Sequence, residues 1–220
     1  MSEKRITLFA GHYGSGKTNI AVNYAVYLKK LGYPVVIADL DIVNPYFRTK
    51  DSEEELREQG IDLICSEFAN SNLDIPSLPQ TMYRVVHDRN FYAVMDIGGD
   101  DAGAVALGRF SEAITEEDNY EMMFVLNLFR PLTRTAEEAY AVLKEIECAS
   151  KLKFTGIVNN SNLGELTTAE DILSTFAETE KLSEMSGLPI IFVSAEKSVC
   201  EKLTGKTERL FPLELQKKYY

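Results

Sequence analysis

The amino-acid sequence predicts an α/β fold with three layers, in which helices cover both faces of a mostly parallel, twisted sheet of about seven strands. Two observations lead to this prediction. Short apolar runs rich in Val, Ile and Phe alternate along the chain with longer stretches whose apolar residues have helical spacing. Runs that are apolar throughout are typical of parallel strands buried on both faces. The 220 residues are enough for a full hydrophobic core, so we expect residues 1–220 to form one domain.

The elements follow in chain order. The runs predicted as strands are Ile6–Ala10, Pro34–Ala38, Ile61–Cys65, Phe91–Met95, Met122–Asn127, Phe154–Asn159 and Pro189–Val193. Helical faces are marked by Ile20–Leu31, by Ala136, Ala139, Tyr140, Leu143 and Ile146, and by Ile172, Phe176 and Leu182.

Two segments carry no predicted strand or helix. Ser66–Pro79 reads as a long loop, where substrates or partners often dock. The tail Lys206–Tyr220 contains Pro212, and a membrane-surface helix there would be too short and too mixed in character.

Residues 11–18 read GHYGSGKT, a complete G-x-x-x-x-G-K-[ST] phosphate-binding loop between the first strand and the first helix. Its glycines let backbone N–H groups converge on phosphate oxygens at the positive end of a helix. Lys17 is expected to act catalytically as a cation at the β- and γ-phosphates, and Thr18 to offer a hydroxyl to Mg²⁺. The residues expected to contact the nucleotide are Gly11, Gly14, Ser15, Gly16, Lys17, Thr18 and Asn19.

Carboxylates stand at the ends of two predicted strands, and parallel strands would bring them to the edge where the phosphate loop lies. Asp96, with Asp39 assisting, is expected to help Thr18 hold Mg²⁺. Asp41 lies two residues from Asp39 on the same face of an extended segment, and one of this pair is expected to orient the attacking water. Gly99 would let the backbone approach the γ-phosphate. The alternative is that these aspartates form turns, which they often do after strands.

These motifs resemble the MinD/ParA branch of P-loop NTPases over about residues 4–195. That branch includes the nitrogenase iron protein, metal-centre maturation ATPases and relatives that process cobyrinic acid. Asp39-Leu40-Asp41 is similar to the family's first switch, which implies that Asp41 positions the hydrolytic water. Residues 96–100, DIGGD, are similar to the second switch of the iron protein. Residues 156–160, GIVNN, look like the strand whose final asparagine reads adenine, which implies this role for Asn160, with Asn159 as the neighbouring option; an Asn-rich turn is the alternative.

The phosphate loop departs from the family pattern at two positions. The family loop reads G-K-G-G-x-G-K-[ST], and its first lysine reaches the partner's nucleotide across a dimer. His12 and Tyr13 stand at the second and third positions here. A histidine is mostly neutral near pH 7 and does not replace a permanent cation. His12 could contact phosphate, become charged when nucleotide binds, or point away from the site. The resemblance therefore does not imply that a partner chain completes the catalytic site. A homodimer remains compatible with the sequence.

Bulk properties exclude several classes of function. A formal net charge of −11 argues against nucleic acid as a partner. No apolar run approaches the roughly 20 residues of a membrane span and no N-terminal signal is recognisable, so we expect no stable membrane insertion and a cytoplasmic protein. Cys65, Cys148 and Cys200 are scattered, which predicts buried free thiols and no metal cluster.

We therefore expect a Mg²⁺-dependent ATPase that uses ATP and ADP to switch conformation, with metal-centre maturation or protein positioning as its setting. ATP is favoured over GTP because no N-K-x-D motif follows the late strand. The client or substrate is not identified. The alternatives are a small-molecule phosphotransferase or synthetase related to dethiobiotin synthetase and cobyrinic acid amidase, and a nucleotide-binding protein without turnover. For Arg48 and Arg130 the sequence allows two roles, which are stabilisation of charge on the transferred phosphate and a surface ion pair.

Overall fold

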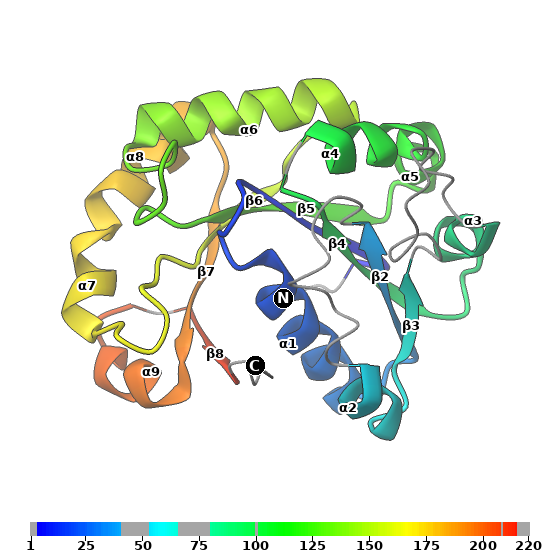
Figure 1. Ribbon diagram of the computed structural model, residues 1–220, viewed down its shortest axis with the longest axis horizontal. Coiled ribbons are helices and arrows are strands. Elements are labelled where there is room, and N and C mark those ends of the chain that lie inside the picture. The colour runs from blue at the N-terminus through cyan, green and yellow to red at the C-terminus, as the bar shows by residue number, and fades with distance from the viewer. Residues whose placement is uncertain (1–3, 41–52, 66–79, 100, 208, 215–220) are drawn as a thin grey trace, which may run out of the picture.

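The computed structural model describes residues 4–40, 53–65, 80–99, 101–207 and 209–214, and these build one sheet of eight parallel strands (Figure 1). The strands are β1 Ile6–Ala10, β2 Val35–Leu40, β3 Asp62–Cys65, β4 Tyr92–Ile97, β5 Tyr120–Leu126, β6 Gly156–Asn159, β7 Ile190–Glu196 and β8 Leu210–Leu213. The helices are α1 Lys17–Lys30, α2 Glu53–Glu58, α3 Gln80–His87, α4 Asp101–Gly108, α5 Ser111–Glu117, α6 Ala136–Ser150, α7 Ala169–Ser174, α8 Phe176–Ser186 and α9 Lys197–Leu203. The predicted α/β fold class is confirmed.

The strand order is β3-β2-β4-β1-β5-β6-β7-β8, which places β1 near the middle of the sheet. From β1 the chain moves to one side to form β2, β3 and β4, and it then adds β5 to β8 on the other side. Ligands of open α/β sheets bind beyond the carboxyl ends of strands at such a reversal of strand order. The loop that follows β1 lies at this point.

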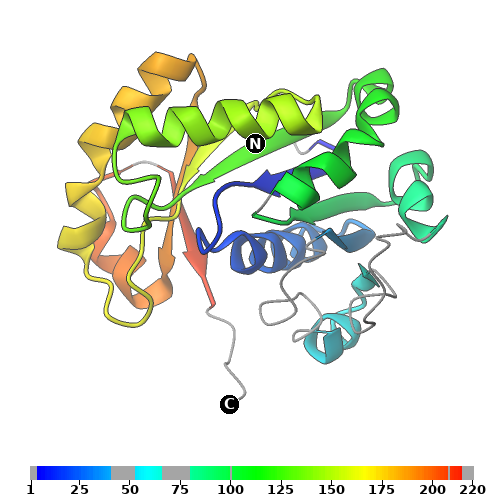
Figure 2. The same cartoon turned by 45° about the horizontal axis from the view of Figure 1, so that its top comes forward.

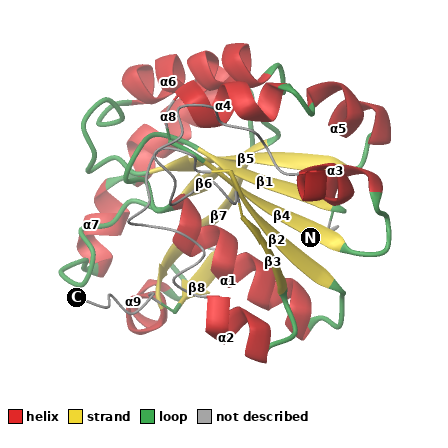
Figure 3. Cartoon of the chain, turned by 45° about the vertical axis from the view of Figure 1, so that its right-hand side comes forward, coloured by secondary structure: helices red, strands yellow, loops and turns green. Residues whose placement is uncertain are grey.

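Helices cover both faces of the sheet because successive side chains of each strand point to opposite sides. In β1, Phe9 packs with Ile20 and Leu28 of α1. Its neighbour Leu8 belongs to the other layer, which includes side chains of α3 to α6 and α8 such as Leu143. Figures 2 and 3 show α1 on one side of the sheet and α4 and α6 on the other. A third cluster joins α7 and α9 to the β7 end of the sheet.

The structure adds one strand that the sequence did not predict, β8, within the expected tail. Phe211 and Leu213 are buried against the α1 layer, whereas Pro212 is exposed. Pro212 is tolerated because β8 is the outermost strand of the sheet and one row of its backbone groups needs no partner. The backbone of Glu214 then exchanges hydrogen bonds of 2.9 and 3.0 Å with the Asn23 side chain of α1.

Two smaller expectations also need correction. The helical face marked by Ile172, Phe176 and Leu182 is divided between α7 and α8, because Thr175 separates the two helices. Among the cysteines, Cys200 is a buried free thiol whose pKa is raised by burial, as expected, but Cys148 is an exposed free thiol on the solvent side of α6. The side chain of Cys65 lies outside the described part. No described helix is long and apolar enough to cross a bilayer.

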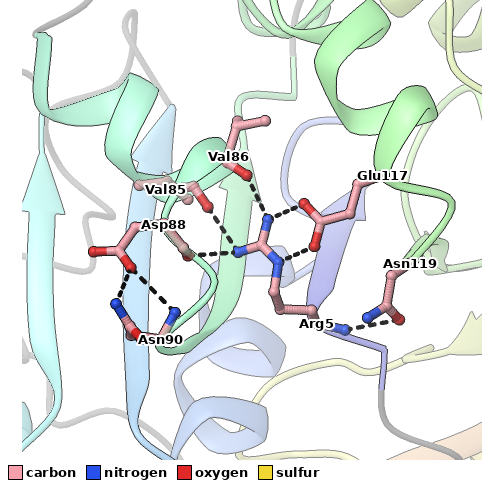
Figure 4. A network of polar contacts seen from close by, with 7 residues as sticks. All are labelled: Arg5, Val85, Val86, Asp88, Asn90, Glu117 and Asn119. Atoms are coloured by element: carbon pink, nitrogen blue, oxygen red, sulfur yellow. Dashed lines mark hydrogen bonds and ion pairs between the residues drawn. The ribbon is translucent and has the colours of Figure 1, made fainter.

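Arg5 fixes the entry of the chain into β1 (Figure 4). Its guanidinium forms an ion pair with Glu117, the last residue of α5, and both side chains are buried. It also donates to backbone oxygens at the end of α3, those of Val85 and Asp88 at 3.1 Å and that of Val86. Because a buried charge needs partners, this network ties β1 to α3 and α5.

Candidate nucleotide-binding site

The phosphate loop turns tightly between β1 and α1. Gly14 and Gly16 have φ angles of +74° and +89°, which residues with a side chain rarely adopt. The N–H of Ser15 donates to the carbonyl of His12 at 3.2 Å and closes the turn. Gly16 is the N-cap of α1, so the positive end of this helix lies at the loop.

Close backbone approaches hold the loop in place. A Cβ at Gly11 would lie 2.5 Å from the carbonyl oxygen of Val125 in β5. A Cβ at Gly99 would lie 2.8 Å from the backbone N of Tyr13. The loop is therefore packed between β5 and the segment that follows β4, and the role of Gly99 at the γ-phosphate stays a prediction.

Lys17 is the first residue of α1 and is almost fully buried. Its Nζ donates to the carbonyl of His12 at 3.2 Å, and a Cβ at Gly99 would lie 2.7 Å from that Nζ. Lys17 thus sits inside the loop, between its first turn and the segment after β4. Its catalytic role remains a prediction.

His12 is held neutral by its surroundings. Burial and the nearby charge of Lys17 lower the pKa of His12 below its ordinary value of 6.5, and Glu145 opposes this only in part. In this state, His12 does not supply the second cation that the family loop carries.

Asp39 of β2 and Asp96 of β4 are directly opposite each other in the sheet register. Each lies two residues after a side chain that packs against α1, Ile37 and Val94 respectively, so both carboxylates are on the α1 face of the sheet. They are 5% and 1% exposed. Two buried carboxylates therefore lie side by side near the carboxyl ends of β2 and β4, the edge of the sheet at which the phosphate loop follows β1.

This donor set fits Mg²⁺. The ion prefers oxygen ligands and is usually held by one or two carboxylates together with phosphate oxygens and water. Asp96 and Asp39 would supply the carboxylates, and Thr18 would supply a hydroxyl. Across the described ranges no group of three or more His, Cys, Asp or Glu side chains could hold a metal ion by itself.

Asn160 lies directly behind the phosphate loop and is 2% exposed. Its Nδ2 donates to the carbonyl of Ser15 at 2.7 Å, and its Oδ1 accepts from the Ser194 hydroxyl at 2.8 Å. A Cβ at Gly16 would collide with the Asn160 amide. Each end of this amide makes one hydrogen bond inside the protein and braces the loop, and the contact with adenine stays a prediction.

Arg130 follows β5 and lies over the loop. Its Nε donates to the carbonyl of Gly14 at 2.9 Å, while the side chain as a whole is exposed. Within the described residues it forms no ion pair, and both roles considered for Arg130 stay predictions.

Some predicted residues fall outside the described part. Asp41 and Arg48, the loop Ser66–Pro79 and Asp100 belong to this group. Asn19, another residue expected to contact the nucleotide, is half-buried in the first turn of α1. Its backbone carbonyl accepts a hydrogen bond from Nδ2 of Asn23 at 2.8 Å.

Sequence reasoning missed two polar residues behind the loop. Ser194 of β7 connects Asn160 to the sheet, and Asn127 after β5 accepts hydrogen bonds from the N–H groups of Phe129 and Asn162 at 3.1 and 3.2 Å. The sequence could have indicated both residues, since each is a polar residue at the carboxyl end of an apolar run.

The chain is similar in fold to several solved FtsY structures. FtsY from Mycoplasma mycoides has a TM-score of 0.55 and 20% identity, over 88% of this chain and 61% of that chain. Chloroplast FtsY from Physcomitrella patens has a TM-score of 0.58 and 18% identity, over 88% and 59%. The signal recognition particle receptor FtsY from Elizabethkingia anophelis, in complex with GDP, has a TM-score of 0.54 and 12% identity, over 88% and 58%. The chain spans about three fifths of the length of these structures, and identities this low show the fold alone.

No curated protein matches the chain. Residues 6–193 match the CobQ/CobB/MinD/ParA nucleotide binding domain, a range that contains β1 to β6, the first part of β7, the phosphate loop, Asp39 and Asp96. This nucleotide-binding P-loop protein belongs to the CobQ/CobB/MinD/ParA family.

Proposed function

We propose that the protein is a Mg²⁺-dependent ATPase that uses the nucleotide cycle as a conformational switch. The observation that carries this proposal is the pair of buried carboxylates, Asp39 and Asp96, on the α1 face of the sheet, whose helix begins with Lys17 directly after the phosphate loop. In such a site, catalysis rests on positioning and on charge stabilisation.

Each residue has a distinct part in this proposal. Lys17 and the N–H groups of the loop bind the phosphates, and Thr18 and Asp96 hold Mg²⁺ with help from Asp39. The ion would neutralise charge on the phosphate oxygens. Gly99, which lies against Lys17 and Tyr13, responds to the γ-phosphate. Asp41 orients the attacking water.

ATP is the proposed nucleotide, although one neighbour in fold is a complex with GDP. Guanine-specific loops of the N-K-x-D type carry an aspartate after the late strand. Here β6 is followed by Asn160, Ser161 and Asn162, which provide no carboxylate. A competition titration of ATP against GTP tests this choice, and a preference for GTP would contradict it.

The central experiment is Lys17→Ala. Removal of the cation at the phosphates should weaken nucleotide binding by about tenfold or more and abolish hydrolysis, since charge-assisted contacts to phosphate are among the strongest polar contacts. Binding is measured by calorimetry and hydrolysis by phosphate release, with and without EDTA to test the need for Mg²⁺. Lys30→Ala, at the exposed end of the same helix, is the matched control. Unchanged affinity and turnover in Lys17→Ala would refute the proposal.

A small-molecule phosphotransferase or synthetase is the second candidate, and the neutral His12 favours it because the dethiobiotin synthetase and cobyrinic acid amidase relatives also lack the signature lysine. The two candidates differ in basal turnover. A switch hydrolyses ATP slowly without additives, whereas an enzyme of the second kind waits for its acceptor. A client protein, a homodimer and a cytoplasmic location belong to the first proposal and are tested with it.

A further inference from the structure

Arg130 brings a guanidinium into contact with the phosphate loop. Its Nε donates to the carbonyl of Gly14 at 2.9 Å. A Cβ at Gly14 would lie 3.3 Å from that Nε and 3.4 Å from Cζ, so the guanidinium lies directly against this glycine. The two terminal nitrogens of a guanidinium are each one bond from Cζ, and they therefore also lie at the loop.

The guanidinium has donors left for a ligand. Arg130 is exposed, and among the described residues its side chain makes a hydrogen bond to Gly14 alone and forms no ion pair. The N–H groups of the terminal nitrogens lie in one plane, in a fixed arrangement that matches the oxygens of a phosphate. Arg130 thus combines an anchored Nε with terminal N–H groups that have no partner in the described part of the chain.

The backbone holds Arg130 in this place without a ligand. Its N–H donates to the carbonyl of Asn127 at 3.1 Å, and its own carbonyl accepts from the N–H of Thr133 at 3.3 Å. Asn127 is fully buried, which fixes the start of this turn. Leu132 has a φ of +64°, a conformation that leucine rarely adopts. Such strain persists only where the surrounding structure enforces it, and here the enforced turn begins at Arg130.

The phosphate loop itself is poor in positive charge. Its permanent cation is Lys17, and this charge together with burial lowers the pKa of His12, which stays neutral. Asp39 and Asp96 add two buried carboxylates near the same edge of the sheet. A triphosphate bound there would bring several more negative charges, which favours a further cation beside Lys17 and Mg²⁺.

A purely structural role is the alternative for Arg130. Its bond to the Gly14 carbonyl would then only stabilise the loop, as the bond from Asn160 to the Ser15 carbonyl does. Asn160 makes that bond with a neutral amide and is buried, whereas Arg130 is exposed and charged. A structural role therefore explains the hydrogen bond but does not explain the charge.

We propose that Arg130 supplies a second cation to the nucleotide site from the same chain, and that its terminal N–H groups bind the phosphate chain of the nucleotide. The bond from Nε to Gly14 keeps the guanidinium beside the loop, and the terminal groups donate to phosphate oxygens when the nucleotide enters. This inference rests on the proposed function for its ligand, a nucleoside triphosphate. It adds a ligand-binding residue that the proposed mechanism does not use.

The test measures the affinity for AMP-PNP, a non-hydrolysable analogue of ATP, by calorimetry in the presence of Mg²⁺. Arg130→Ala should weaken binding by about tenfold or more, because hydrogen bonds between charged groups are the stronger class. The loss should shrink at high salt, which screens exposed charges. GMP-PNP, the guanine counterpart, should show the same relative loss because the contact is with phosphate and not with the base.

Two further variants separate the charge from the hydrogen bond. Arg130→Gln keeps an amide N–H for the Gly14 carbonyl but no charge, and it should bind AMP-PNP as weakly as Arg130→Ala. Arg130→Lys keeps the charge and should bind more tightly than Arg130→Gln. Arg134→Ala removes the same charge from an exposed position in the same loop and is the matched control. Urea unfolding should give all four variants a stability close to that of the wild type, since both side chains are exposed.

Several results would overturn the proposal. Wild-type affinity in Arg130→Ala, an equal loss in Arg134→Ala or a loss that salt does not change would each contradict a contact between Arg130 and phosphate. Wild-type affinity in Arg130→Gln combined with a loss in Arg130→Lys would favour the structural role. None of these measurements requires hydrolysis, so they decide the role of Arg130 even if Lys17→Ala shows that the ATPase proposal is wrong.

Discussion

His12 shows how a single residue can change the electrostatics of a phosphate loop. It shares the loop with Lys17, and burial together with that positive charge keeps the imidazole neutral. The family loop places a permanent cation at this position, whereas here Lys17 is the only basic side chain among residues 11–18 that is charged near pH 7. Binding of triphosphate at this loop would reverse the local potential, so the nucleotide itself would determine whether His12 takes up a proton.

The lowered pKa of His12 has a consequence for stability. Below about pH 6.5 the unfolded chain binds a proton that folded His12 resists, so the free energy of unfolding should decrease as the pH falls through this range. His12→Asn should remove this part of the pH dependence, as measured by urea unfolding at a series of pH values. His87, the other histidine, is replaced in the same way as a control. An equal change in slope for both variants would contradict the assignment to His12.

The sequence indicated that Asn160 is important, but it did not reveal which groups the side chain contacts. Asn160→Ala would leave the Ser15 carbonyl buried without its side-chain donor, at a cost of about 1–3 kcal/mol, whereas the Ser194 hydroxyl would keep its bond to the carbonyl of Asn159 at 3.3 Å. We expect lower stability and weaker nucleotide binding, measured by urea unfolding and calorimetry. Ser194→Ala should show a smaller loss of the same kind. Wild-type nucleotide affinity in Asn160→Ala would show that the brace is dispensable.

At the scale of elements, two helices are followed by a residue in the left-handed conformation, and substitutions at these two positions should have opposite effects on stability. Helix α6 ends at Lys151 with φ of +58°, and α8 ends at Gly187 with φ of +72°. This left-handed conformation favours glycine by roughly 1 kcal/mol over other residues. Lys151→Gly should therefore raise the free energy of unfolding by about 0.5–1 kcal/mol, and Gly187→Ala should lower it by a similar amount. Thermal and urea unfolding measure both, and changes of the same sign would be inconsistent with this account.

The elements that the sequence predicted best are those determined by nearby residues. Fully apolar strands such as β1 matched the prediction because their side chains are buried on both faces wherever they lie in the sheet. β8 was missed because its four residues include a proline and become a strand only when β7 offers a partner. The division between α7 and α8 likewise depends on a distant residue, since Thr175 accepts a hydrogen bond from Asn159 of β6 at 2.9 Å.

At the scale of the whole molecule, the site depends on strand order, which the sequence alone did not reveal. Asp39 and Asp96 are 57 positions apart in the numbering and become neighbours only because β4 inserts between β1 and β2. The sequence identified both carboxylates from their place at the ends of apolar runs. Their pairing, the contact of Gly99 with Lys17, and the bond from Arg130 to Gly14 required the folded chain.

The edge strand β8 is expected to stabilise the whole molecule through Phe211. Its ring packs 4.8 Å from that of Phe192 and 6.0 Å from that of Tyr27 in α1, measured between ring centroids. Phe211→Ala should lower the free energy of unfolding by about 3 kcal/mol, as for large-to-small changes in a core. Pro212→Ala, on the exposed side of the same strand, is the control. A loss below about 1 kcal/mol in Phe211→Ala would mean that β8 contributes little to the core.

The network around Arg5 has a mechanical consequence for the far end of β1. At one end this strand is bound to the end of α3 and to Glu117, and at the other Gly11 lies against the carbonyl of Val125. β1 has five residues and is about 17 Å long, and because both of its ends are held, we expect it to keep its position in the sheet. When a nucleotide enters or leaves, we therefore expect the phosphate loop to stay in place and the segment at Gly98 and Gly99 to move.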